Sequence, residues 1–579
     1  MARQFDPITL EILWRRLISI VDEADASVYR TAFSSLIRDA HDYTNAVFDR
    51  QGRELAEGSL VTPGLLGALS NAVRTIVAKY PEDSHKPGDI LFSNDPWLLS
   101  GHLNDICLVS PIFFKNKLVA FTACIFHHAD IGGRPGAENH EVYEEGLFIP
   151  LMKLSDGGVI NESMLELIRW NVRRPDDVMG DLRSQMAANH VCSQKIIEMM
   201  DETGLDTLDD LSDEIIRRTE RSMREAISAI PDGVYEAETL IEGAGDIADI
   251  KIKLSVAVQG DAIAIDFAGT GPQVRWGVNT VLNFTYSYVN FAIKSAFNPD
   301  IANNHGSTMP VTVTAPAGSI VNCTFPAPVA HRTMVGHRLT EVVYQAMSQI
   351  APKQVLAECG TAPGSSSVIY GTRHDGRRFL TMDLRASGMG ASHLQDGVNC
   401  THFPANSSNT PCEILESDTP FIVEKRAILR DSGGPGRRRG GLGQEVIWRI
   451  PEDERAPRPP VTVATVMARV KEPPKGIFGG RPGGQGIYQI NGVDVEWGGL
   501  NLCQPGDVIR FVQPGGGGYG EPFEREPELV LEDVRNDYVS IEKARAEYGV
   551  AIDPNTLELD EAGTQALRAA RPLQREAAQ

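Results

Sequence analysis

Two apolar runs, ICLVSPIFF and KLVAFTACIF, are separated by only Lys115 and Asn116, and this spacing constrains the fold more than any other feature of the sequence. Apolar runs that flank a two-residue polar turn are typical of a β-hairpin. The sequence therefore predicts a hairpin of two strands over residues 106–114 and 117–126, with Cys107 and Cys124 in the core.

Polar side chains gather at the open end of this hairpin. SNDPWLLSGHLND leads into the first run, and HHADIGG follows the second. With a two-residue turn, Asn104 lies opposite His127 and Asp105 lies opposite Phe126. His127 therefore returns to the end of the sheet that carries His102 and Asp105. Cross-strand neighbours are about 5 Å apart, so one metal ion could contact side chains from both strands.

Imidazole and carboxylate ligands suit a divalent ion such as Zn, Mn or Fe, whereas an all-sulfur site needs paired cysteines. Candidates for a fourth ligand are Asp42, in RDAHDYTNAVFD, and Asp130, in HHADIGG. Such an ion would lower the pKa of a bound water towards about 7. Spacing alone leaves an alternative open, in which these side chains only cap the end of the hairpin through hydrogen bonds.

Composition limits the class of protein. The formal net charge of −22 argues against a nucleic-acid partner and against an anionic membrane surface, because both would repel the chain. No apolar run approaches the roughly 20 residues that span a bilayer, and the N-terminus lacks the apolar core of a secretory signal. The eight cysteines form no C-x-x-C pair, which suits reduced thiols. We therefore expect a cytoplasmic protein.

Helices followed by strands predict an α+β fold of several layers. From Gly233 the pattern alternates, as in IKIKLSVAVQGDAIAIDFAGT, which indicates strands. Residues 45–57 predict a strand, a turn and a returning strand. Helical periodicity is found at residues 7–35, 61–80, 163–171, 181–229 (interrupted near Gly204) and 334–350.

Four regions follow from these patterns. Residues 1–230 form a mixed helical and hairpin region that bears the candidate metal site, and residues 231–420 form a β-rich middle region with helices. Residues 421–525 form a glycine-rich β region, and residues 526–579 form a helical C-terminal tail.

Glycine clusters mark the third region: DSGGPGRRRGGLG, GIFGGRPGGQG and QPGGGGYGEP. None has the spacing of a phosphate-binding G-x-x-x-x-G-K-[ST] loop or of a strand–G-x-G-x-x-G–helix unit. We interpret them as tight turns, and the sequence shows no ATP site.

Six motifs along the chain resemble, in order, those of the hydantoinase B/oxoprolinase family. They are SNDPWLLSGHLNDI, HHADIGGRPG, EEGLFIPLMKL, DFAGTGPQV, SGGPGRRRGGLG and PGGGGYGEP. The family includes ATP-dependent hydantoinases and lactamases, 5-oxoprolinase, and subunits of acetone and acetophenone carboxylases. The resemblance extends from Pro7 to the segment 541–550, nearly the whole chain.

The resemblance implies a division of labour. A hydantoinase A-type partner with an actin-like ATPase fold binds ATP and Mg and phosphorylates the substrate, and the B-type subunit completes the reaction at a divalent metal site. We expect His128 to contact a ligand or the substrate, and we assign His128 and Asp130 catalytic roles. The metal ligands implied by the matching motifs are Asp42, His102, Asp105 and His127.

Three functions are compatible with these observations. The first is the metal-dependent subunit of a hetero-oligomeric, ATP-dependent hydrolase of a cyclic amide, namely a hydantoin, oxoproline or lactam. The second is a subunit of an ATP-dependent ketone carboxylase. The third is a non-catalytic scaffold, in which a metal ion only ties the hairpin to the N-terminal segment.

Overall fold

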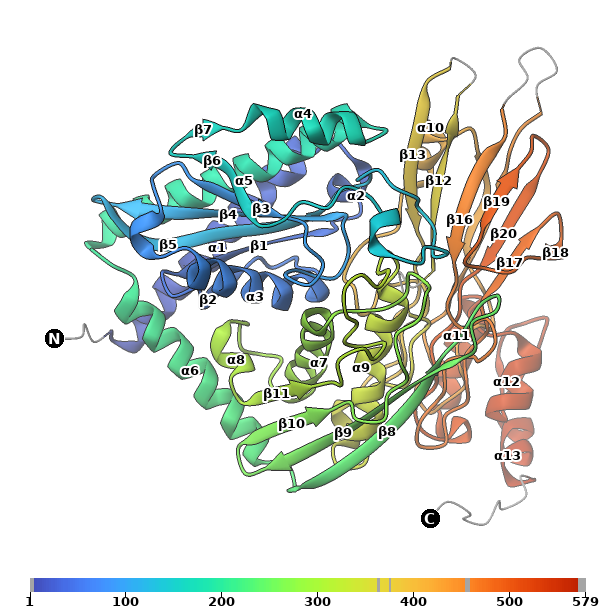
Figure 1. Cartoon of the computed structure of the whole chain (residues 1–579). Coiled ribbons are helices and arrows are strands. Elements are labelled where there is room, and N and C mark those ends of the chain that lie inside the picture. Colours follow the sequence, from blue (N-terminus) through green and yellow to red (C-terminus); the bar gives the residue numbers. More distant parts are fainter. Residues whose placement is uncertain (1–4, 362–364, 374–375, 453–458, 571–579) are drawn as a thin grey trace.

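An antiparallel seven-stranded sheet forms the N-terminal part of the computed structural model, which describes residues 5–361, 365–373, 376–452 and 459–570 (Figure 1). Its strand order is β2-β1-β5-β4-β3-β6-β7. The strands are β1 (Tyr43–Asp49), β2 (Glu54–Glu57), β3 (Ile90–Ser93), β4 (Asp105–Phe114), β5 (Lys117–His127), β6 (Met152–Asp156) and β7 (Val159–Ile160).

Helices cover both faces of this sheet. On one face, α1 (Pro7–Thr31) and α5 (Pro175–Thr203) share an apolar core with Leu108 and Phe126. On the other, α3 (Pro63–Lys79) packs with Val109 and Ile125. Because successive strand residues point to opposite faces, a fully covered sheet needs apolar residues at nearly every position. This burial explains the continuous apolar runs.

The predicted hairpin is confirmed, with one correction to its register. Lys115 and Asn116 form the turn, and their positive φ values of 49° and 62° are those of a two-residue hairpin loop. A β-bulge at Val119 then shifts the pairing by one residue. Asp105 consequently pairs with His127, so the predicted partner Phe126 was wrong.

Further layers lie beyond α3. Helix α7 (Leu282–Phe297) packs between α3 and α9 (Thr333–Met347), and α9 covers a four-stranded sheet of order β11-β10-β9-β8 (Figure 1). That sheet contains β8 (Gly233–Ile241), β9 (Ile250–Gln259), β10 (Ala262–Asp266) and β11 (Val311–Thr314). The α+β class and its layered arrangement are therefore confirmed.

The C-terminal half adds two more sheets, with orders β13-β12-β16-β19 and β14-β15-β20-β17-β18. The sheet of order β13-β12-β16-β19 joins strands that precede residue 420, the predicted boundary between the second and third regions, with strands that follow it. The division of the chain into four regions stays a prediction. The strands are β12 (Ser366–Thr372), β13 (Arg378–Leu384), β14 (Ile422–Ile428), β15 (Gln444–Arg449), β16 (Val461–Val466), β17 (Ile487–Ile490), β18 (Val493–Asp494), β19 (Leu500–Cys503) and β20 (Val508–Val512).

The remaining elements complete the predicted pattern. Gly204 ends α5 in the left-handed conformation, with a φ of 63°, where the interruption was expected. Helices α11 to α13 and a two-stranded sheet form the C-terminal region, of which residues 571–579 lie outside the described residues. The elements are α2 (Ser35–Arg38), α4 (Glu162–Asn171), α6 (Asp209–Ser228), α8 (His305–Thr308), α10 (Cys412–Asp418), α11 (Pro527–Arg535), α12 (Ile541–Tyr548), α13 (Glu561–Ala569), β21 (Ala551–Ile552) and β22 (Leu559–Asp560).

Within the described part of the chain, no helix is both long and apolar enough to cross a membrane.

The glycine clusters are more than the tight turns that their composition predicted. They are backbone segments that pack directly against one another around residues 514–518. Gly516 donates a hydrogen bond to Gly441 O and accepts one from Gly434 N, each 2.8 Å long. Gly518 donates to Arg481 O at 3.0 Å. Side chains would hold these segments apart, so glycine is required by close approach in addition to any turn.

Substituting a glycine in this cluster should therefore destabilise the protein by steric overlap. A Cβ on Gly440 would lie 1.9 Å from Gly516 O, whereas a Cβ on Gly484 would lie 3.4 Å from its nearest neighbour, Ser432. We expect Gly440→Ala to cost about 3 kcal/mol and Gly484→Ala to cost far less. Thermal unfolding followed by circular dichroism measures both; equal melting temperatures would contradict the close-packed arrangement.

Candidate metal centre

Four of the predicted site residues meet at one end of the seven-stranded sheet. Asp42 directly precedes β1, Asp105 begins β4, and His127 ends β5. The backbone of His127 donates a hydrogen bond to Asp42 O at 3.1 Å, which joins these ends. His102 lies in the loop before β4, three residues from its partner Asp105.

Pairing in the sheet decides which side chains face one another. Asp105 and His127 are directly opposite, so they point to the same face. Asp42 directly precedes Tyr43, the first residue of β1, and is four positions before Ala46, so both side chains lie on the same face of the sheet. Ala46 packs with Ile125 on the face that α3 covers. The three side chains therefore share the face covered by α3 and α7.

The polar atoms of the four residues are close enough to share one ion. Asp105 Oδ1 lies 2.7 Å from His102 Nε2 and 3.8 Å from His127 Nδ1, and Asp42 Oδ2 lies 3.1 Å from His127 Nδ1. Ligand atoms bound 2.0–2.2 Å from a common metal are about 3 to 4 Å apart. His102, Asp105 and His127 are buried, and Asp42 is partly buried. The separations fit a coordination sphere.

The tautomer of His102 gives a stronger indication. Its Nδ1 lies 3.2 Å from Ala330 O, and a carbonyl can only accept, so Nδ1 carries the hydrogen. Burial lowers the pKa of His102 to about 4, which leaves the ring neutral at pH 7. Nε2 then presents a lone pair to the Asp105 carboxylate. Two facing lone pairs repel unless a cation lies between them, so the donor set fits a metal ion.

Asp105 is fixed by a second set of contacts through its other oxygen. Oδ2 accepts hydrogen bonds from Arg332 Nη2, at 2.7 Å, and from the Ser100 hydroxyl. Burial alone would raise the pKa of Asp105, but its interactions with His102 and with the Arg332 guanidinium outweigh burial and hold this pKa well below its usual range. Asp105 is therefore a carboxylate, with Oδ1 left free to face the histidines. Such outer contacts orient metal ligands.

A cavity of about 50 Å³ adjoins the cluster. His331, Arg332 and His337 from the start of α9 line it together with Tyr288 from α7. Burial lowers the pKa of His331 to about 4 and that of His337 to about 3, so both imidazoles are neutral at pH 7. The cavity has room for a few waters. It can supply neutral donors and acceptors beside the cluster.

His128 and Asp130 lie outside the cluster. His128 points to the opposite face of the sheet, where its Nε2 lies 3.0 Å from Gln185 Oε1 in α5. Asp130 accepts hydrogen bonds from Gly132 N and from the side chain of Arg173, at 3.0 and 2.9 Å, and thereby holds its loop to the start of α5. Both residues therefore make contacts that support the structure around the cluster. Their catalytic role stays a prediction.

Sequence reasoning missed the residues that α9 supplies. Only residues 334–350 were predicted, as a helix, yet Arg332 and His331, just before α9, reach the cluster and its cavity. The available signal was the group of basic residues in AHRTMVGHR, at the start of a helix whose other residues are mostly apolar. Buried basic side chains need a partner or a function.

A buried pair of histidines with two carboxylates is a candidate site for a divalent metal ion, and comparison with known proteins gives the family of the chain. The sequence profile described as hydantoinase B/oxoprolinase matches residues 6–522. The chain belongs to this family.

Two described relatives are similar in sequence over nearly the whole chain. The B-type subunit of a putative D-/L-hydantoinase from Pseudomonas sp. (strain NS671) is 31% identical, with 98% of each chain covered. The beta subunit of caprolactamase from Pseudomonas jessenii is 33% identical over 98% of this chain and 99% of its own length.

Solved structures share the fold. A chain from the crystal structure of the ATP-dependent caprolactamase of Pseudomonas jessenii has a TM-score of 0.88 at 29% identity, with 98% of this chain and 100% of that chain covered. Nucleotide-free acetone carboxylase has a TM-score of 0.83 at 19% identity, with 97% and 82% covered. The second likeness shows a common fold only.

A paired substitution tests the metal centre. Asp42→Asn keeps the size of the side chain but removes a charge that balances a divalent ion, so we expect the purified protein to lose bound metal by at least about tenfold. Asp39→Asn is the matched control, because Asp39 contacts Arg38 at 2.8 Å instead of the cluster. Elemental analysis of both proteins gives the metal content. Full metal in Asp42→Asn, or equal loss in both variants, would remove Asp42 from the site.

Proposed function

We propose that this chain is the metal-bearing subunit of an ATP-dependent enzyme that opens a cyclic amide. The observation that carries the proposal is the buried group of His102, Asp105 and His127, together with the partly buried Asp42 beside His127, whose facing lone pairs suit a divalent ion such as Zn, Mn or Fe. Membership of the hydantoinase B/oxoprolinase family supports the substrate class: a hydantoin, oxoproline or lactam.

A partner subunit follows from what the chain lacks and from its relatives. The sequence has no phosphate-binding loop of the G-x-x-x-x-G-K-[ST] type. Two relatives are themselves described as single subunits, one of a hydantoinase and one of a caprolactamase. We assign ATP and Mg to a hydantoinase A-type, actin-like ATPase subunit, which phosphorylates the amide oxygen before the substrate reaches the present chain.

This division of labour has a chemical reason. A cyclic amide is stabilised by resonance and is a poor electrophile, whereas its O-phosphorylated form resembles an imidate ester and is open to attack by water. A divalent ion at the site would act as a Lewis acid and lower the pKa of water. The residues of this chain fix the geometry, since Arg332 and Ser100 leave only one oxygen of Asp105 facing the cluster.

The surrounding residues also limit access to the site. The adjoining cavity of about 50 Å³ is too small for a five-membered or larger ring with its substituents. Substrate entry therefore requires the cavity to widen. The wall includes Ala405 and Ser407 from the segment before α10, which lies outside regular secondary structure and is the part of the wall best able to move.

The activity can be tested with the complete enzyme. The chain, co-expressed with its A-type partner, should open at least one of hydantoin, 5-oxoproline and caprolactam when supplied with ATP and Mg, and should hydrolyse ATP in step. Asp42→Asn should reduce ring opening at least about a hundredfold, while Asp39→Asn stays close to the unchanged protein. Absence of ring opening with every ring would contradict the proposal.

A labelling experiment distinguishes the alternative function, a ketone carboxylase, from a cyclic amide hydrolase. With acetone or acetophenone and ¹⁴C-bicarbonate, a ketone carboxylase would incorporate label into an acid-stable product, whereas a cyclic amide hydrolase would not. The third possibility, a structural ion in a scaffold, predicts that His102→Ala leaves ring opening undiminished in an intact assembly.

A further inference from the structure

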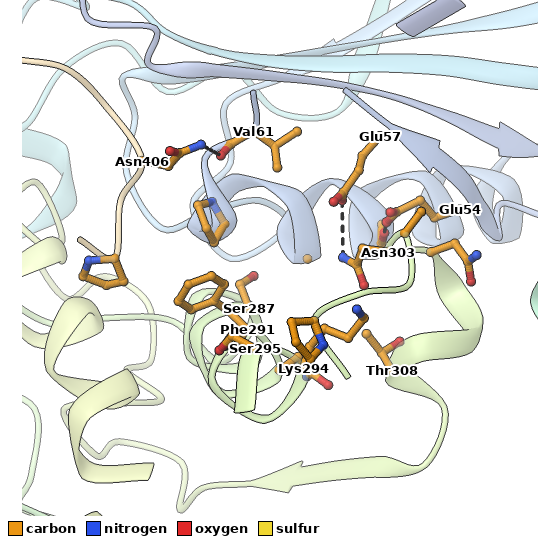
Figure 2. Close-up of a pocket in the computed structure, with 18 of the residues that line it drawn as sticks. Glu54, Glu57, Val61, Ser287, Phe291, Lys294, Ser295, Asn303, Thr308 and Asn406 are labelled. Atoms are coloured by element: carbon orange, nitrogen blue, oxygen red, sulfur yellow. Dashed lines mark hydrogen bonds between the residues drawn. The ribbon is translucent and has the colours of Figure 1, made fainter. Parts of the chain in front are cut away.

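A second, larger cavity of about 510 Å³ lies beside the metal centre and shares no residue with the four-residue cluster (Figure 2). Residues from β2, α3, α7, α8 and the segment before α10 line it. Helices α3 and α7 and that segment contribute to both cavities, so the two are neighbours. The proposed reaction gives this space no role.

Two carboxyl groups project into this cavity from one strand. Glu54 and Glu57 are three residues apart in β2, and an undistorted strand would point them to opposite faces. A bulge corrects this: Glu57 pairs with Ala46 and Glu54 with Phe48, which leaves Leu55 as the extra residue. Since Ala46 and Phe48 share a face, the two glutamates do as well. Figure 2 shows Glu57 pointing to Asn303, with Glu54 nearby.

The carboxyl pair has unused hydrogen-bonding capacity. Glu54 is only 4% exposed, and its Oε2 accepts a hydrogen bond from the Ser70 hydroxyl. Its Oε1 receives none from any N–H or hydroxyl group of the described residues, and the further interaction of Glu54 is with the Glu57 carboxyl, through a shared proton that a cation can replace. Glu57 Oε2 accepts one long bond, 3.3 Å, from Asn303. A buried carboxylate oxygen without a donor costs free energy that a ligand can recover.

Burial shifts the ionisation of the pair. It raises the pKa of Glu54 to about 7, and burial together with the neighbouring Glu54 charge raises the pKa of Glu57 well above its usual value. At neutral pH the two groups therefore retain at least one proton between them. A cation placed against both would stabilise the doubly charged form and release that proton.

The basic groups that face the pair offset its charge only in part: Arg74 acts on Glu54 and Lys294 on Glu57 through charge, yet burial still raises both carboxyl pKa values. Lys294 of α7 lies across the cavity, but its ammonium donates to the carbonyls of Asn298 and Ile301. Arg74 of α3 is exposed and makes no ion pair within 4.0 Å among the described residues. The other titratable groups lining the cavity are Tyr286, His305 and His402.

The rest of the wall combines apolar side chains with serine, threonine and asparagine side chains. Phe291 and Phe403 lie near each other, with ring centroids 5.9 Å apart, and Val61, Pro63 and Ile301 also line the cavity. A cavity with an acidic end and apolar side chains elsewhere in its wall suits a ligand with one cationic group and a hydrocarbon portion.

We propose that this cavity binds a small primary amine, with its ammonium group between Glu54 and Glu57 and its hydrocarbon chain along Phe291 and Phe403. An ammonium group has three donors, enough for the free oxygen of Glu54 and for Glu57. Binding itself does not depend on the proposed reaction. One consequence does: hydrolysis of a lactam gives an amino acid with a new amino group and a new carboxylate, and the cavity would bind that amino group beside the site that forms it.

Direct binding tests the proposal. The full chain is titrated with n-hexylamine by isothermal titration calorimetry. EDTA in the buffer removes metal ions that the amine could otherwise bind. We expect saturable binding of n-hexylamine and no binding of hexanoate. The titration is then repeated at pH 7 in phosphate and in MOPS, two buffers with different heats of ionisation. A difference between the two measured binding heats shows that binding releases protons to the buffer. Absence of n-hexylamine binding, or equal binding of hexanoate, would overturn the proposal.

Variants locate the site. Glu57→Gln and Glu54→Gln should each weaken n-hexylamine binding at least tenfold and change the number of protons released, because one of the two carboxyl groups is lost. Glu238→Gln, at an exposed position of β8, is the matched control, and Asp42→Asn should bind the amine like the unchanged protein. Equal affinity in all variants would overturn the assignment. Because the assay contains neither ATP nor metal, its outcome is independent of the ring-opening assay.

Discussion

A single extra residue in one hairpin determines whether the metal centre can form. Without the bulge at Val119, Asp105 would pair with Phe126, and Asp105 and His127 would point to opposite faces of the sheet. The bulge restores a common face, and the shared pairing of β1 with β5 then adds Asp42 on the same side. Helix α9 completes the arrangement, because Arg332 at its start lies against Asp105, the buried carboxylate of the cluster.

The same device operates in β2, where an extra residue aligns Glu54 with Glu57. Bulges are frequent next to binding and catalytic sites because they re-aim side chains without breaking the sheet. Both irregularities lie in one sheet whose faces are otherwise covered by helices. Regular pairing therefore supplies stability in this protein, and departures from regular pairing supply its clusters of titratable groups.

The sequence predicted the regular parts well, because periodicity and turn residues are local signals. It also brought Asp42, His102, Asp105 and His127 together, through the hairpin and the family resemblance. The bulge could not be predicted, since two continuous apolar runs look alike in either register. Arg332 lies 227 residues from Asp105, and no local pattern links them. The glycine clusters were interpreted as turns because close approach of backbones is a property of the tertiary structure.

The glycine cluster also bears on the order of folding. Its segments come from the region 358–518, their glycines carry no side chains that could collapse together, and the segments are held by hydrogen bonds to one another. Backbone amides gain little from leaving water until their partners are in place. We therefore expect the cluster to form only after the surrounding sheets have brought distant segments together. Its contacts join residues far apart in the sequence, so its formation is a late and cooperative step of folding.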